Sequence, residues 1–157
     1  QLSQEVIERI GKDLVSATRV LICGEDSFCL CLSEFQTLLL FEGKEVHIRS
    51  IIDKKVIYDL VNTFDKNDMI FIITPRESLE SLLESHELDD IIQFQQMVNI
   101  PVKKVFIGQK SIFHMKYLGF ELIPLPYAID DYLYLFAVID FIYQLSSSYL
   151  RMKNANK

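Results

Sequence analysis

The sequence has few of the residues that mark disulfide-rich, metal-binding or nucleic-acid-binding chains. Its 157 residues include three cysteines, and the 22 acidic residues outnumber the 16 basic ones, for a formal net charge of −6. Cys29 and Cys31 lie two residues apart on a predicted helix and point to different sides, which disfavours both a disulfide framework and a metal site. Phosphate backbones are bound by clustered Lys and Arg, so the acidic balance argues against a nucleic-acid surface on this chain.

Other signals are also missing. The chain has five glycines and no G-x-G-x-x-G, so there is no dinucleotide-binding fingerprint. No signal peptide precedes the first predicted helix. The most apolar late segment, residues 129–149, contains Asp130, Asp131 and Asp140, which predicts a core helix and not a membrane span. We therefore expect a cytoplasmic protein with reduced thiols, no membrane partner and no cofactor.

The predicted strands and helices are organised around residues 19–27. Residues 20–23 form an apolar run too short for a helix and end at Gly24, which predicts a strand buried on both faces, followed by a tight turn. Asp26 or Ser27 is expected to cap a helix that runs from there to a C-terminal glycine at Gly43. A strand, a glycine turn and a helix N-terminus place backbone N–H donors at the carboxyl edge of a sheet, where we expect one wall of any ligand site.

The remaining pattern alternates strands with helices and contains no repeat or linker. After the first strand, Asp53 is expected to cap a helix, Gly108 to end the fourth strand, and Pro124 and Pro126 to stop the fifth. We expect one domain over residues 1–157, with an opening helix, an α/β core and a closing helix in three α/β/α layers around a parallel sheet. Strands are predicted at residues 20–23, 45–48, 69–73, 102–107 and 120–123, and helices at 2–16, 28–43, 53–64, 79–99, 111–117 and 128–149, the core covering 19–125.

Several of these features carry a family resemblance. They are the helix leading into residues 17–24, the nineteen-residue step from Gly24 to Gly43, Asp68 before the third strand, and the closing segment 132–143. The chain resembles a sugar isomerase (SIS) domain, more specifically the C-terminal effector domain of the RpiR family of bacterial transcriptional regulators. The resemblance implies five strands in the flavodoxin-like order 2-1-3-4-5. It also implies a helix-turn-helix DNA-binding domain upstream of Gln1, absent from this fragment.

The two ligand motifs of that family are altered here. A G-x-G-x-S motif laid on Gly24 puts Asp26 at the second glycine and Phe28 at the serine, with Ser27 one position away. An S-x-S-G-x-T motif after the third strand retains only Thr74. Arg76, Glu77 and Leu79 replace its second serine, glycine and threonine. Losing the glycine hinders close approach of backbone to a phosphate, and Arg76 is the compensating cation.

Five residues are the candidates for holding a ligand, and ordinary structural roles are open to them as well. Ser27 is more often a helix cap, and Arg76 can pair with Glu77 or Glu80 at the surface. His47, His86 and His114 show no metal-ligand spacing. The candidate ligand-binding residues are Gly24, Ser27, Thr74, Arg76 and Ser78, and no residue is predicted to be catalytic.

The resemblance implies an effector-sensing and dimerisation domain that binds a sugar phosphate or related carbohydrate derivative and reaches DNA only through the upstream domain. Two alternatives stay open. A phosphosugar isomerase would need an acid and a base, and Glu25, Glu77 and His114 are available but lie in no motif. The second alternative is a dimer module with a non-functional pocket. The closing helix is apolar nearly all round, which predicts a homodimer through this helix or the opening one.

Overall fold

The computed structural model describes residues 3–50, 52–73, 96, 99–109, 119–125 and 131–155. Most of the predicted helix at 79–99 and all of that at 111–117 lie outside this part. The described elements, in chain order, are α1 (Gln4–Ser16), β1 (Arg19–Gly24), α2 (Asp26–Cys29), the 3₁₀ turn η1 (Leu30–Leu32), α3 (Ser33–Phe41), β2 (Glu45–Ser50), α4 (Lys54–Val61), β3 (Met69–Ile73), β4 (Lys103–Gln109), β5 (Phe120–Leu125) and α6 (Asp131–Ala155).

The five strands form one parallel sheet in the order β2-β1-β3-β4-β5, as predicted. In the register of the central pair, Val20 lies beside Met69 and Gly24 beside Ile73. All five residues of β3 are buried, which is why its sequence is an unbroken apolar run instead of an alternating one. The predicted α/β class with a five-stranded sheet is therefore confirmed.

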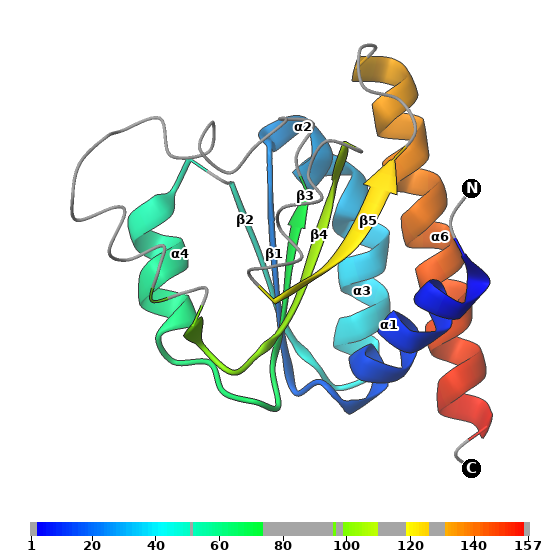
Figure 1. Cartoon of the computed structure of the whole chain (residues 1–157), viewed down its shortest axis with the longest axis horizontal. Helices are drawn as coiled ribbons and strands as arrows, with labels where there is room; N and C mark the ends of the chain where they lie inside the picture. Colours follow the sequence, from blue (N-terminus) through cyan, green and yellow to red (C-terminus); the bar gives the residue numbers. More distant parts are fainter. Residues whose placement is uncertain are drawn as a thin grey trace.

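Helices cover both faces of the sheet, with α1, α3 and α6 on one side and α4 on the other (Figure 1). Side chains of β1 alternate between the two layers, because successive residues of a strand point to opposite faces. Val20 and Ile22 join the core cluster beneath α1, α3 and α6. Leu21 and Cys23 join the smaller cluster beneath α4.

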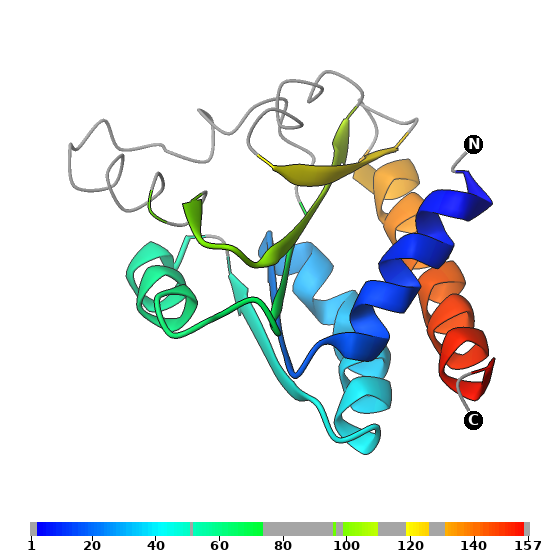
Figure 2. The ribbon, with the colours of Figure 1, turned by 60° about the horizontal axis from the view of Figure 1, so that its bottom comes forward.

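The opening and closing helices cross closely on the first face (Figure 2). At the crossing, Gly11 of α1 meets Ser148 of α6, and a Cβ built on Gly11 would lie 2.5 Å from the Ser148 Oγ. The Ser148 hydroxyl is fully buried and donates a 3.4 Å hydrogen bond to the Ile7 carbonyl. Gly11 is therefore required for space, since any side chain there would overlap α6.

One predicted helix start differs from the structure, and a second has the expected N-cap residue, Asp53, without its capping bond. The helix after β1 begins at Asp26 itself, so neither Asp26 nor Ser27 stands at a capping position. The expected single helix to Gly43 is divided into α2, η1 and α3, a 3₁₀ turn being a common way to redirect short helices. Gly43 ends α3 with φ +82°, as its C-terminal position predicted. Asp53 precedes α4, but its side chain makes no capping hydrogen bond.

The last two strands are longer than predicted. Gly108 does not end β4, which continues to Gln109, and it pairs with Pro124 inside β5. Proline was expected to stop β5 because it lacks an N–H donor. However, among the described strands β5 lies at the edge beside β4, and an edge strand tolerates such a residue on its unpaired side. Pro126 lies outside the described residues.

The closing helix extends past its predicted end at residue 149 to Ala155. An ion pair between Lys153 and Glu42 joins this extra turn to the end of α3. The inward face of α6 carries Val138, Phe141 and Leu145, all fully buried. In the described part of the chain, no helix has the length and hydropathy to cross a membrane.

Lys44, the residue before β2, contacts both the end of α1 and α6. Its buried ammonium donates hydrogen bonds to the carbonyls of Val15, at 3.0 Å, and Ala17, at 2.5 Å, which lie at the end of α1. It also lies 5.7 Å from the centre of the Tyr149 ring of α6. Burial lowers the pKa of Lys44. The neutral amine still has two N–H groups, enough for both carbonyls.

We expect Lys44→Met to lower the free energy of unfolding by about 1–3 kcal/mol, because two buried carbonyls lose their donor. The pKa of Lys44 is lower in the native state than the 10.5 of the unfolded chain. At a pH between these two pKa values, the unfolded chain binds more protons than the native one. The contribution of Lys44 to native stability therefore rises with pH in this range. The cost of the variant should therefore be larger at pH 10 than at pH 8. Urea unfolding at both pH values measures it. Lys12→Met, on the exposed side of α1, is the control and should show neither effect.

Candidate ligand site

The sheet order defines where a ligand site belongs in this fold. The chain leaves β1 for β2 on one side and returns to β3 on the other, so the connections diverge between the carboxyl ends of β1 and β3. In open parallel sheets, ligands bind at such a switch point. Gly24 and Ile73 are the paired residues that end these two strands.

Gly24 is needed at this point for close packing. The tight turn predicted after Gly24 is present, with α2 starting two residues later, but among the described residues positive φ occurs only at Gly43 and Gly119, so this turn does not use a left-handed backbone at Gly24. A Cβ at Gly24 would lie 3.3 Å from the Ile73 carbonyl oxygen and 3.8 Å from the Phe28 Cβ. The glycine therefore lets the end of β1, the end of β3 and the start of α2 come together at the switch point.

The other predicted site residues are only partly placed. Ser27 lies on α2, directly after the end of β1, and its side chain is outside what the structure describes. Thr74, Arg76 and Ser78 follow β3 and also lie outside the described residues. Phe28, expected at the place of a family serine, is 3% exposed and belongs to the core cluster shared with α1, α3 and α6. The structure thus brings Gly24 and the α2 backbone to the expected edge, and the rest of the predicted site stays a prediction.

Two further groups reach this edge that the sequence did not indicate. The Cys29 thiol donates to the carbonyl oxygens of Gly24, at 3.6 Å, and Arg49, at 3.8 Å, which lie near the ends of β1 and β2. Arg49 is a cation one residue from the end of β2, and its side chain turns back along the strand. The Arg49 guanidinium lies 2.8 Å from the Ile48 carbonyl and 3.4 Å from the His47 ring. The strand pairing sets Arg49 beside Cys23 of β1.

Cys23 lies just below the same edge and is chemically quiet. Burial raises the pKa of its thiol to about 12, with a smaller contribution from neighbouring Cys29. A thiol with this pKa stays protonated near neutral pH and is a poor nucleophile and metal ligand. The described residues contain no group of three or more His, Cys, Asp or Glu side chains arranged for a metal ion.

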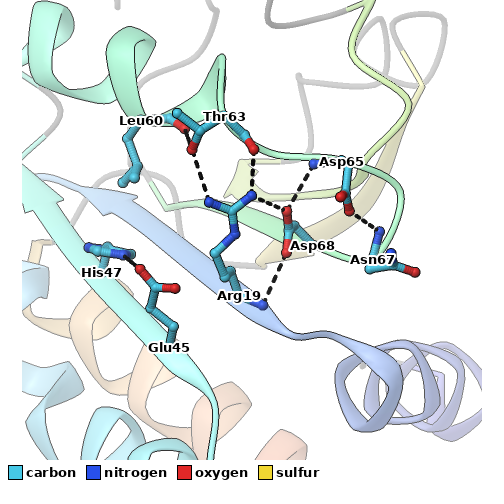
Figure 3. Close-up of polar contacts among 8 residues, drawn as sticks. All are labelled: Arg19, Glu45, His47, Leu60, Thr63, Asp65, Asn67 and Asp68. Carbon is cyan, nitrogen blue, oxygen red and sulfur yellow. Dashed lines mark hydrogen bonds and ion pairs between the residues drawn. The ribbon is translucent and has the colours of Figure 1, made fainter.

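The best-connected polar cluster lies at the opposite, amino edge of the sheet (Figure 3). Asp68, before β3, accepts hydrogen bonds from the Arg19 backbone N–H at 3.1 Å, the Asp65 N–H at 2.9 Å and the Arg19 guanidinium at 2.9 Å. The same guanidinium contacts Thr63 and lies 4.6 Å from the centre of the Phe64 ring. The hydrogen bond to Asp68 raises the pKa of Arg19. This cluster ties β1 to the turn before β3, which is a structural role.

A hollow of about 230 Å³ also lies at the amino edge, between α1 and the starts of β3 to β5. Its charged lining is largely paired. Arg9 of α1 pairs with Glu121 of β5, and Asp13 of α1 lies 3.7 Å from Lys103 of β4. These exposed ion pairs hold α1 against the sheet and contribute little each. The hollow is therefore not the site predicted at the carboxyl edge.

Comparison with known proteins identifies the fold. No protein-family model matches the sequence, and no curated protein matches it. Among solved structures, NanR of Vibrio vulnificus complexed with ManNAc-6P aligns with a TM-score of 0.66 at 12% identity, over 98% of this chain and 58% of that one. The sugar isomerase domain of the RpiR transcription factor from Sphaerobacter thermophilus aligns with a TM-score of 0.63 at 11% identity, over 99% and 84% of the two chains.

A third match is the C-terminal domain of glucosamine-fructose-6-phosphate aminotransferase from Francisella tularensis, with a TM-score of 0.62 at 14% identity, over 96% of this chain and 40% of that one. The chain therefore has the fold of a sugar isomerase (SIS) domain. Within that class it resembles the sugar isomerase domains of RpiR-type regulators, as the sequence predicted.

Proposed function

We propose that this chain is the effector-sensing and dimerisation domain of an RpiR-type transcriptional regulator, binding a sugar phosphate or related carbohydrate derivative. The observation that carries the proposal is the close-packed switch point at Gly24 and Ile73, in a fold shared with NanR complexed with ManNAc-6P. The effector would lie between the Gly24 loop and the segment holding Thr74, Arg76 and Ser78. It would act by biasing the arrangement of a homodimer and so the spacing of upstream DNA-binding domains.

The proposal also covers the domain organisation, cellular location and partners of the chain. Residues 1–157 form a single domain that works in the cytoplasm, with no cofactor and no membrane partner. The net charge of −6 supports leaving DNA contact to a domain outside this chain. A non-enzymatic role is supported by the regulator domains among the similar structures and by the absence of a motif that singles out Glu25, Glu77 or His114.

An isomerase is the second candidate, because one similar structure is described as a putative sugar-phosphate isomerase, from Listeria monocytogenes. We expect no interconversion of aldose and ketose phosphates by this chain, measured by NMR of the sugar pool. Turnover that disappears in Glu77→Gln would establish the enzyme instead.

The altered motifs predict which ligands bind. Asp26 and Glu77 each oppose an anion by on the order of 1 kcal/mol near a protein surface, similar to what Arg76 contributes. We therefore expect glucose 6-phosphate to bind no more tightly than about 1 mM, measured by calorimetry. A carbohydrate derivative of lower charge, or one that depends on Arg76, should bind better.

A thermal-shift screen of phosphorylated and unphosphorylated sugars tests the proposal, since a ligand of the native state raises the melting temperature. A phosphorylated effector should lose its shift in Arg76→Ala and keep it in Lys12→Ala, because Lys12 lies on the exposed side of α1. Micromolar binding of glucose 6-phosphate that survives Arg76→Ala would show that neither loop works as proposed. A screen without any shift would favour the module with a non-functional pocket.

A further inference from the structure

The hollow at the amino edge of the sheet is apolar on its inner side. Ile10 of α1, Met69 of β3 and Val105 of β4 border it and are each 1% exposed. Lys104 also borders it, but its ammonium donates a 3.1 Å hydrogen bond to the Ile100 carbonyl. The hollow has a volume of about 230 Å³. Since an apolar cavity of about 150 Å³ holds a benzene ring, this volume suits roughly nine non-hydrogen atoms. A hexose phosphate is nearly twice that size.

Four other charged side chains surround the apolar lining, and their signs alternate. Arg9 and Asp13 are one turn apart on α1 and so lie on the same face of the helix. Across the hollow, Glu121 of β5 pairs with Arg9. Lys103 of β4 lies 3.7 Å from Asp13, beyond hydrogen-bonding distance. Strand pairing sets Glu121 beside Val105, two residues after Lys103, so both charges lie on the face of the sheet that α1 covers. Each of the two walls therefore presents one cation and one anion.

We infer that this hollow binds a free α-amino acid with an aliphatic side chain of about leucine size. Arg9 binds the carboxylate of the ligand in place of Glu121, and Asp13 accepts hydrogen bonds from its ammonium in place of Lys103. The aliphatic side chain covers the apolar lining. The site lies at the edge of the sheet opposite the proposed sugar site, so the inference goes beyond the proposed function and does not depend on it.

The alternating charges favour a ligand that carries both signs. A carboxylic acid without an amino group lies near the carboxylates of Asp13 and Glu121, and an amine without a carboxylate lies near Arg9 and Lys103. Displacing the existing partners costs little. The side chains of Arg9 and Lys103 are 51% and 64% exposed, and ion pairs at such exposed positions add little stability.

Calorimetry of the full chain with L-leucine, without any sugar, tests the site. We expect saturable binding with a Kd of about 0.1–1 mM, reasonable for a ligand with so few atoms. Two analogues that each lack one charge, 4-methylpentanoate and 3-methylbutylamine, should bind about tenfold more weakly or worse. Glycine lacks the aliphatic group and L-tryptophan exceeds the volume, so both should also bind more weakly than L-leucine. No saturable binding of L-leucine up to about 10 mM, or equal affinity for 4-methylpentanoate, would overturn the inference.

Two variants test where the amino acid binds. Arg9→Gln and Asp13→Asn should each weaken L-leucine binding by about tenfold or more, because each removes the partner of one charged group. Both variants should keep the circular dichroism of the natural chain, since they alter exposed ion pairs. Lys12→Gln is the matched control. It removes a charge from the exposed side of α1, away from the hollow, and should leave the affinity unchanged. Undiminished L-leucine binding in either Arg9→Gln or Asp13→Asn would show that the amino acid does not bind in this hollow.

Discussion

Asp68→Ala is expected to lower the free energy of unfolding by about 3 kcal/mol, which corresponds to a melting temperature lower by roughly 10 °C in a chain of this size. The carboxylate is 2% exposed and accepts three hydrogen bonds, two of them from Arg19. Its removal leaves two backbone N–H groups and a partly buried guanidinium without their acceptor. Thermal and urea unfolding followed by circular dichroism measure the loss.

Two comparisons give this prediction its specificity. Asp59→Ala removes a carboxylate from the exposed side of α4 and should change stability by less than about 0.5 kcal/mol. Asp68→Asn keeps one carbonyl oxygen as an acceptor, so its free energy of unfolding should lie between those of Asp68→Ala and Asp59→Ala. If Asp68→Ala is as stable as Asp59→Ala, the cluster at the amino edge does not hold β1 to the turn before β3.

Gly11→Val should be comparably damaging, lowering the free energy of unfolding by about 3 kcal/mol. The cause is steric: Ser148 occupies the place of the new side chain, with its Oγ 2.5 Å and its Cβ 3.2 Å from the position of a Gly11 Cβ. Separating α1 from α6 would also expose the inward side chains that the two helices share. Urea unfolding should be followed by far-ultraviolet circular dichroism, because the chain has no Trp and therefore no tryptophan fluorescence.

Gly43 provides the contrast, because it is needed for its backbone conformation and not for space. Its φ is +82°, and nothing lies within 4 Å of a Cβ built there. Asparagine tolerates this region of φ, so Gly43→Asn should cost less than about 1 kcal/mol. Gly11→Asn should remain severely destabilising. Equal costs at the two positions would mean that the close crossing of α1 and α6 is not what requires Gly11.

Much of the fold could be predicted because burial on both faces leaves a clear pattern. β3 has five consecutive apolar residues, and a central parallel strand is the structure that accepts them. The errors occurred where tertiary contacts decide. Pro124 is tolerated because β5 is an edge strand, and α6 continues to Ala155 with Lys153 paired to Glu42, far away in sequence.

The candidate site was less predictable than the fold. Gly24 could be found because a glycine at the end of a buried strand indicates a constraint on the backbone, and the structure adds that its neighbours pack closely around it. Arg49 could not be found, because the pairing of β1 with β2 sets it beside Cys23. A short motif contains no information about such neighbours.

The position of the Arg19–Asp68 cluster has a consequence for how sequences of this fold diverge. The Arg19–Asp68 interactions join β1 and β3 at the amino edge of the sheet, away from the loops at the carboxyl ends of the strands. The folding stability that this cluster provides is therefore independent of the sequence of those loops, whereas Gly24 and Phe28 at the carboxyl edge stay constrained by their own packing.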